Sequence, residues 1–170
     1  SPENVMKEIL EVAQFHADKP VNVMFSDPNF IGNPKNVECL CDLLIERDLN
    51  LEFGALVRPD MMANNPQVVR KMCQAGIVKF EMGIESPNVK DLKSTRKGIA
   101  TKSHKQAVKN IRENGGRAGG TFVIGLPDQT EDEIKTFPLY AKEIGLTAAA
   151  FGIATPFPGT EFYEELDKKG

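Results

Sequence analysis

Apolar residues recur along the chain in short runs that alternate with longer amphipathic stretches. Runs of four to nine residues rich in Val, Ile, Phe and Ala are typical of strands, whereas apolar positions at helical spacing indicate amphipathic helices. The predicted strands span residues 21–25, 51–57, 77–84, 118–126 and 148–154. The predicted helices span residues 3–18, 35–48, 65–75, 102–114, 131–144 and 160–168.

Local signals support several of these boundaries. Thr130 is followed three residues later by Glu133, which predicts a capping box at the start of a helix. Gly76 and Gly115 stand where a helix would end in a left-handed conformation. Each pair of successive strands is separated by about the length of one βα unit, so the sheet is predicted to be parallel and the fold class to be α/β.

Polar or conformationally special residues follow every predicted strand. Doubly wound sheets concentrate binding chemistry at one switch point, whereas (β/α) barrels distribute it over many strand ends, and the pattern here favours a barrel. Five strands cannot close an eight-stranded barrel, and no strand precedes the first helix. We therefore expect a partial TIM-like barrel of about five parallel strands that lacks the first strand, with residues 1–170 forming a single domain cut from a larger barrel.

Composition narrows the possible functions. The 170 residues are 41% hydrophobic and 26% charged, which is close to the globular average and excludes intrinsic disorder. The net charge is −3 and no basic stripe is present, so nucleic-acid binding is not expected. No apolar run is long enough to span a bilayer and the first residues do not resemble a signal peptide. We expect a cytoplasmic protein that does not contact membranes.

The cysteines and histidines form no recognisable metal motif. Cys39 and Cys41 lie two positions apart in a predicted helix, where they point to nearly opposite sides. With Cys73, they are expected to be buried structural thiols. His16 and His104 fall on separate helices and are expected at the surface. No metal site is predicted within the chain.

Three strand ends carry candidate binding groups, each with a plainer structural alternative. Glu85 ends an apolar strand, where its carboxylate could accept hydrogen bonds from two ribose hydroxyls or simply cap the next turn. Arg58 offers a fork for a carboxylate or phosphate but could instead pair with Asp60. The backbone at 125–127 could meet an aromatic ring or form an ordinary βα turn.

The order of these motifs resembles the radical S-adenosylmethionine (SAM) superfamily. The resemblance covers nearly the whole chain. It is strongest to the branch that often carries a cobalamin-binding domain and includes the anaerobic magnesium-protoporphyrin monomethyl ester cyclase and many methyltransferases. The motifs that carry it are, in order, SDPNF, VRPD, KMCQAGIVKFEMGIES, LKSTRKGIAT, GGTFVIGLPDQTEDEIKT and ATPFPGTEFYEEL.

This resemblance implies a partial barrel that holds SAM against a [4Fe-4S] cluster, which cleaves it reductively to a 5′-deoxyadenosyl radical. Glu85 would take the ribose hydroxyls, and Ser26 and Asp27 would meet the methionine amino group. Arg58 and Lys97 are weaker candidates for the methionine carboxylate or the substrate. The residues expected near the adenine are Val123, Gly125, Leu126 and Phe157.

One departure from the family pattern concerns the cluster. Radical SAM proteins ligate the cluster through CxxxCxxC after the first barrel strand, and this sequence contains no such spacing. We therefore expect that the first strand and the cluster loop are missing and that the chain alone is inactive. The parent would act on a small-molecule substrate by methyl transfer or oxidative cyclisation, with cobalamin as a possible further cofactor.

Two other interpretations remain open. The chain could be a cluster-free, barrel-like module that binds a nucleotide or an acidic metabolite through Glu85, Arg58 and the strand ends, or a scaffold fragment without a ligand. In either case a missing first strand would leave the edge of residues 21–25 exposed, which favours self-association.

Overall fold

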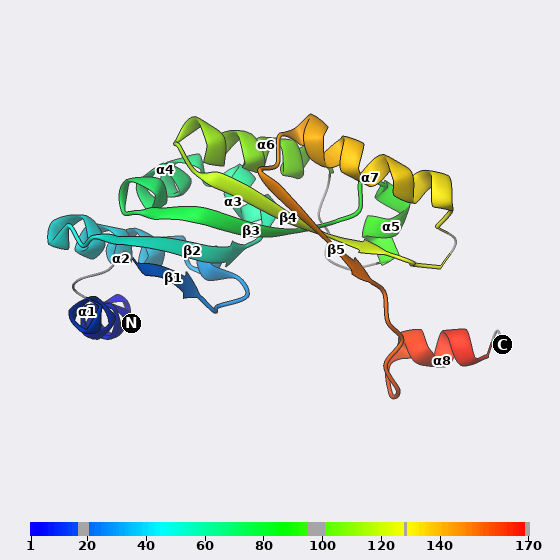
Figure 1. The fold of residues 1–170 in the computed structure, drawn as a ribbon, viewed down its shortest axis with the longest axis horizontal. Coiled ribbons are helices and arrows are strands. Elements are labelled where there is room, and N and C mark those ends of the chain that lie inside the picture. Colours follow the sequence, from blue (N-terminus) through cyan, green and yellow to red (C-terminus); the bar gives the residue numbers. More distant parts are fainter. Residues whose placement is uncertain (17–20, 95–100, 128, 169–170) are drawn as a thin grey trace.

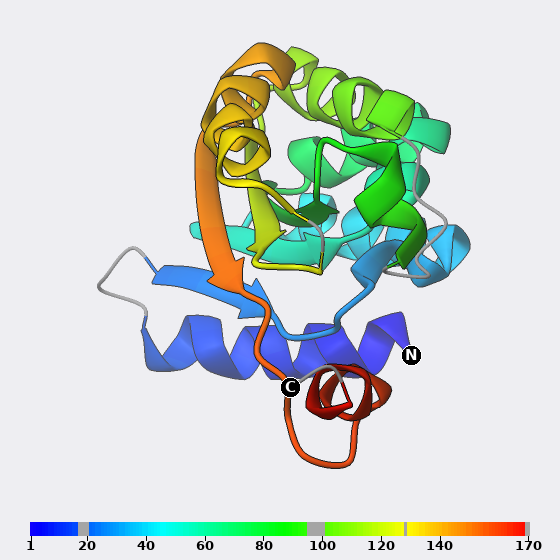
Figure 2. The ribbon, with the colours of Figure 1, turned by 90° about the vertical axis from the view of Figure 1, so that its right-hand side faces the viewer.

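The computed structural model describes residues 1–16, 21–94, 101–127 and 129–168, and its centre is a five-stranded parallel sheet in the order β1-β2-β3-β4-β5. Lys97, one of the weaker sequence candidates, lies outside these residues. Figure 2 shows the sheet curled into a half-barrel, as expected. The strands are β1 (Val21–Phe25), β2 (Leu51–Val57), β3 (Ile77–Glu85), β4 (Arg117–Ile124) and β5 (Ala148–Ile153).

Helices precede, connect and follow the strands, because a parallel connection must return the chain to the opposite end of the sheet. Figure 1 shows α3, α4, α6 and α7 along one face of the sheet. In the described part of the chain, no helix is long and apolar enough to cross a membrane. The helices are α1 (Pro2–Phe15), α2 (Pro34–Arg47), α3 (Pro59–Asn64), α4 (Pro66–Gln74), α5 (Val89–Ser94), α6 (Thr101–Glu113), α7 (Glu131–Ile144) and α8 (Glu161–Asp167), with a short 3₁₀ turn η1 (Phe30–Gly32) before α2.

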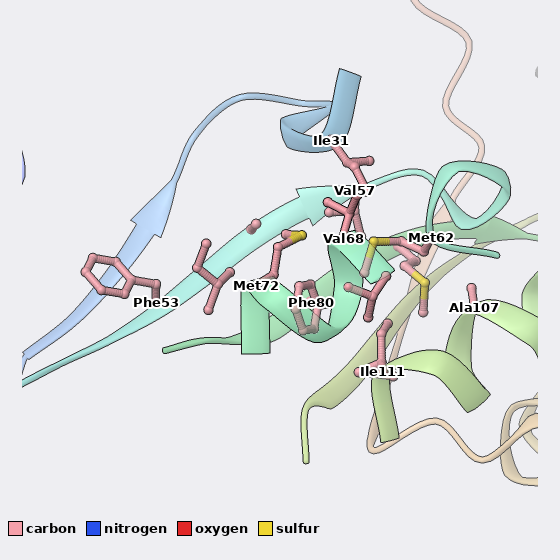
Figure 3. Close-up of a cluster of buried hydrophobic side chains, with 14 of the residues drawn as sticks. Ile31, Phe53, Val57, Met62, Val68, Met72, Phe80, Ala107 and Ile111 are labelled. Carbon is pink, nitrogen blue, oxygen red and sulfur yellow. The ribbon is translucent and has the colours of Figure 1, made fainter. Parts of the chain in front are cut away.

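The hydrophobic core lies between this helical layer and the sheet. Alternate residues of β2 and β3, such as Phe53 and Phe80, are buried there. They meet apolar side chains of α3, α4 and α6, among them Met62, Met72 and Ile111 (Figure 3). Burial of each large side chain contributes roughly 1.5–3 kcal/mol, so this layer supplies most of the favourable free energy of folding.

Most predicted elements are confirmed to within a few residues. The capping box at α7 is present, with Thr130 Oγ1 accepting from Glu133 N and Thr130 N donating to the Glu133 carboxylate. Gly76 and Gly115 adopt positive φ values of 83° and 80°. The fourth strand ends at Ile124 and not at residue 126, because Gly125 turns the chain with a φ of 79°.

Helix α3 was not predicted, and a buried side chain from another helix completes it. A six-residue segment has too few turns for a helical period to be visible in the sequence. In the structure, Asn110 of α6 donates from Nδ2 to the carbonyl of Met62 at 2.9 Å, at the end of α3. Its Oδ1 accepts from Gln106 Nε2 at 2.8 Å. A long-range contact thus satisfies a backbone group that the short helix leaves open.

Replacing Asn110 by Leu should therefore destabilise the protein by about 1–3 kcal/mol, because a buried carbonyl loses its donor. Urea unfolding followed by circular dichroism would measure the change. Lys109→Ala, an exposed neighbour on α6 whose Nζ lies 3.8 Å from Glu113, should change the free energy of unfolding by no more than about 0.5 kcal/mol. Equal effects of the two substitutions would contradict the role of Asn110.

The expected surface position of His104 is wrong. Its side chain is fully buried between α6 and α7, whereas His16 is exposed as expected. His104 Nδ1 lies 3.0 Å from the Tyr140 hydroxyl, and Nε2 has no hydrogen-bond partner among the described residues. Burial lowers the pKa of His104 to about 4 and raises the pKa of Tyr140 to about 12. The imidazole is therefore neutral at pH 7 and acts as part of the core.

This burial predicts a pH dependence of stability. The pKa of His104 is about 4 in the folded state, below its ordinary value of 6.5, so the unfolded chain binds the proton more readily. Its contribution to stability is complete above pH 6.5 and is lost as the pH falls toward 4, by up to about 1.4 kcal/mol per pH unit. Denaturant unfolding at several pH values should show a shallower slope for His104→Leu. His16→Ala should retain the original slope, and an unchanged slope in His104→Leu would refute the assignment.

Candidate functional site

The carboxyl ends of the five parallel strands lie at one edge of the sheet, which faces the viewer in Figure 2. At this edge β3 ends at Glu85 and β4 turns at Gly125. Because β3 and β4 are paired neighbours, with Glu85 opposite Phe122, the turns that follow them also lie close together. The structure thus brings together two groups of residues that the sequence singled out.

Glu85 occupies an unusual backbone position. The register of β3 against β4 shifts between Gly83 and Glu85, which marks a β-bulge. Ser86 N donates to the Ile84 carbonyl at 2.8 Å, so Glu85 is the central residue of a three-residue turn, and its φ is 64°. This turn is rare for a residue with a side chain and costs on the order of 1–3 kcal/mol. Such strain is concentrated at functional sites.

The Glu85 side chain is buried, with the residue only 5% exposed. Burial of a carboxylate is unfavourable unless hydrogen bonds or an opposite charge compensate it. A carboxylate offers several acceptor positions, so Glu85 can receive hydrogen-bond donors from a ligand in addition to its contacts within the protein. An exposed carboxylate that merely caps the next turn is therefore not what the structure contains.

Ser86, directly after Glu85, belongs to a buried polar network. Its Oγ donates to Asp91 Oδ2 at 2.7 Å and accepts from Asn88 N at 3.0 Å. Gln129 Nε2 donates to the same Asp91 oxygen at 2.7 Å. Gln129 Oε1 accepts from Leu126 N at 3.1 Å. The network therefore connects the turn after β3 with the turn after β4.

The candidate residues for the adenine come from the end of β4 with its turn and from one further loop. Val123, Gly125 and Leu126 lie at the end of β4, where Gly125 approaches Ile153 of β5, 3.7 Å from the position that a Cβ would take. Phe157 lies on the loop between β5 and α8 and is 66% exposed. The first three are neighbours in the chain, whereas Phe157 comes from a separate loop and its side chain is exposed.

Ser26 and Asp27 follow β1 and are exposed. Asp27 Oδ1 accepts from Asn29 N at 2.8 Å, so one carboxylate oxygen forms the local turn. Asn29 Oδ1 is buried and has no hydrogen-bond partner in the described part of the chain. Asp27 and Asn29 line a cavity of about 340 Å³. The cavity is otherwise lined by the start of α1, by η1 and by α2, and its acceptors suit an ammonium or amide group. Asn29 was not among the sequence candidates.

Arg58 and Asp60 form the pair that the sequence left as an alternative. Arg58 Nε donates to Asp60 Oδ1 at 3.0 Å and Nη2 donates to Oδ2 at 2.9 Å. The Arg58 guanidinium lowers the pKa of the Asp60 carboxyl and the carboxylate raises the pKa of Arg58. The two-pronged contact fixes the guanidinium at the start of α3 and occupies two of its donors.

The sheet face opposite the helical layer carries polar residues that sequence analysis did not select. Glu52 of β2 forms ion pairs with Lys79, at 2.8 Å, and with Arg117, and these contacts lower its pKa. Further along β3, Glu81 lies across Gly119 of β4, and its carboxylate fills the space where a Cβ on Gly119 would lie. Partial burial raises the pKa of Glu81. Lys79 and Glu81, at alternate positions of one predicted strand, were the sequence signal that could have revealed this polar face.

No metal centre is formed by the described residues, since no three His, Cys, Asp or Glu side chains converge. Burial raises the pKa of Cys41 to about 12 and that of Cys73 to about 11, so both are thiols and poor ligands at neutral pH. Cys39 is exposed and Cys73 is half-buried, so the prediction that all three cysteines are buried holds only for Cys41. It lies on the solvent side of α2 because two residues along a helix turn the side chain by more than half a circle. These residues do not fit an iron-sulfur cluster.

Comparisons with known proteins place these features in a family. The sequence profile of the Radical SAM superfamily matches residues 1–138. An uncharacterized methyltransferase of Pyrococcus horikoshii is 30% identical over 162 residues, which cover 95% of this chain and 35% of that protein. The anaerobic magnesium-protoporphyrin IX monomethyl ester cyclase of Rubrivivax gelatinosus is 23% identical over 168 residues, or 99% of this chain and 30% of the cyclase. The chain thus spans about a third of the length of these relatives.

A solved structure confirms the fold. The radical S-adenosylmethionine methyltransferase TsrM from Kitasatospora setae, with cobalamin and a [4Fe-4S] cluster bound, superposes with a TM-score of 0.82 at 15% sequence identity. The match covers 99% of this chain and 32% of TsrM. At this identity the likeness shows the architecture alone. The profile match over most of the chain, on a parallel half-barrel of this kind, shows that the chain belongs to the radical SAM superfamily.

Proposed function

We propose that residues 1–170 form one domain of a radical SAM enzyme and that this domain binds SAM at the carboxyl ends of its strands. The observation that carries the proposal is Glu85, a buried carboxylate held in a strained turn at the end of β3 and beside the turn after β4. Family membership supplies the identity of the ligand. The local geometry supplies the reason for placing its nucleoside half at this point of the sheet.

Each candidate residue has a distinct role in this proposal. Glu85 accepts hydrogen bonds from the two ribose hydroxyls. Ser26 and Asp27 receive the methionine amino group, and the unpaired acceptor of Asn29 beside Asp27 supports an amino group there. Arg58 meets the methionine carboxylate or the substrate through its guanidinium. The residues proposed to contact the adenine are Val123, Gly125, Leu126 and Phe157.

The full-length enzyme is proposed to carry its [4Fe-4S] ligands outside this sequence, because the residues described here do not form a metal site. Held by those outside ligands, the cluster would supply the reducing electron for cleavage of SAM. The relatives include a cyclase and a methyltransferase, so oxidative cyclisation and methyl transfer on a small-molecule substrate are the proposed reactions. Cobalamin is proposed as a further cofactor by similarity to TsrM, which binds it.

Substitution of Glu85 in the full-length protein tests the proposed ribose contact. Each charge-assisted hydrogen bond contributes roughly 1.5–3 kcal/mol, so Glu85→Ala should weaken SAM binding by about tenfold or more, and Glu85→Gln by less. Glu85→Gly should also lose affinity while tolerating the positive φ of this position. Isothermal titration would measure affinity, and melting curves would measure stability.

Glu131→Gln is a suitable control, because this carboxylate is 91% exposed at the start of α7. It should leave SAM affinity unchanged. If Glu85→Ala keeps its affinity and loses only thermal stability, Glu85 is a structural residue and the proposed cofactor site is wrong.

We also propose that the isolated chain self-associates through β1. This strand pairs with β2 along one edge, and no strand in the described ranges pairs with its other edge. Unpaired N–H and C=O groups on an edge strand favour pairing with another chain. Sedimentation velocity of the original chain should show oligomers whose fraction rises with concentration.

Met24→Lys replaces a side chain of β1 that is 53% exposed by a charged one, and it should reduce the fraction of oligomers. A monodisperse monomer of the original chain at all concentrations would overturn the proposal.

A further inference from the structure

Two separate turns of the site meet at one carboxylate oxygen. The turn after β3 contains Glu85 and Ser86, and Ser86 Oγ donates to Asp91 Oδ2 at 2.7 Å. The turn after β4 contains Gly125 and Leu126, and it reaches the same oxygen through Gln129, whose Nε2 donates at 2.7 Å. Asp91 lies in the first turn of α5, outside both turns.

Burial strengthens the hydrogen bond between Ser86 and Asp91. Ser86 is fully buried and Asp91 is 7% exposed, so water does not compete freely for their hydrogen bonds. Both bonds to Asp91 are short and have an acceptor that is a carboxylate when ionised, which makes them stronger than bonds between neutral groups. On the side of β4, Gln129 and Leu126 are half-buried and their hydrogen bonds are partly shielded from water.

The hydrogen bonds of Ser86, Asp91 and Gln129 lie beside the strained backbone of Glu85. Glu85 has a φ of 64°, and a residue with a side chain remains in that region only when its surroundings hold it there. Ser86 is the next residue and is held by Asp91 and by Asn88 N. On the other side, Gln129 Oε1 accepts from Leu126 N at 3.1 Å, directly after the positive φ of Gly125. Both unusual turns are therefore fixed by one set of side chains.

We propose that Asp91 is a positioning residue that sets the relative placement of the Glu85 turn and the Gly125–Leu126 turn. It acts through Ser86 on one side and through Gln129 on the other, and it does not itself contact the cofactor. The inference rests on the proposed function, in which these turns receive the ribose and the adenine of SAM. Asp91 holds the ribose and adenine parts of the site in their binding positions before the ligand arrives. The protein therefore does not have to order these turns on binding, which would cost free energy.

The test uses the full-length protein and S-adenosylhomocysteine, a probe that retains the ribose and the adenine. Asp91→Ala removes the shared acceptor and should weaken binding about tenfold. Asp91→Asn keeps one oxygen that can accept from both Ser86 and Gln129, so its affinity should stay within about threefold of the original. Asp132→Ala, at an aspartate whose side chain is 94% exposed on α7, is the matched control and should bind normally. If Asp91→Ala fails to fold, Gln129→Ala replaces it, because this substitution breaks the link to Leu126 and leaves the Ser86 contact in place.

A double variant separates positioning from general stability. If Asp91 acts through Glu85, the loss of affinity from Glu85→Ala should be much smaller in the Asp91→Ala background than alone. Fully additive losses, or unchanged binding in both Asp91→Ala and Gln129→Ala, would overturn the role of Asp91 while the proposed function stands. Unchanged binding in Glu85→Ala would instead refute the proposed function itself.

Discussion

Parallel pairing of consecutive strands is the constraint on which the rest of this structure depends. Each strand pairs with the next one in the chain, so every connection must cross back over the sheet, and the crossover helices form one apolar layer. The core forms beneath that layer. Parallel pairing also places all the strand ends that carry Asp27, Arg58, Glu85 and Gly125 at the same edge. The site is therefore a consequence of the topology before any single residue is considered.

Within this frame, the neighbouring ends of β3 and β4 differ from ordinary βα turns. A bulge and a three-residue turn bring Glu85 into a conformation that a non-glycine residue avoids, and Gly125 turns the chain at the end of the adjacent strand. The hydrogen bonds of Ser86, Asp91 and Gln129 connect both turns. Strain and the interactions that maintain it lie together, as is common where a protein holds a ligand in a defined geometry.

The other ionisable side chains discussed above have mainly structural roles. Burial keeps His104 neutral between α6 and α7 and keeps Cys41 a thiol. On the sheet face opposite the helices, Glu52 balances Lys79 and Arg117 near the amino ends of the strands. The charges of Glu52, Lys79 and Arg117 compensate one another there, whereas the proposed cofactor site lies at the carboxyl ends of the strands.

The sequence by itself determined the strands, the long helices, the parallel order and the family, because apolar periodicity and turn residues are local properties of the chain. It also identified Glu85 and the turn at Gly125. It did not predict α3 or α5, and it placed His104 at the surface, since burial of that ring depends on the packing of α7 against α6. Only the tertiary structure decided the strained turn at Glu85 and the contacts of Asp91. The turn lies at a bulge in the pairing of β3 with β4, and Gln129 lies 38 residues from the carboxylate that it meets, so neither is visible as a local sequence pattern.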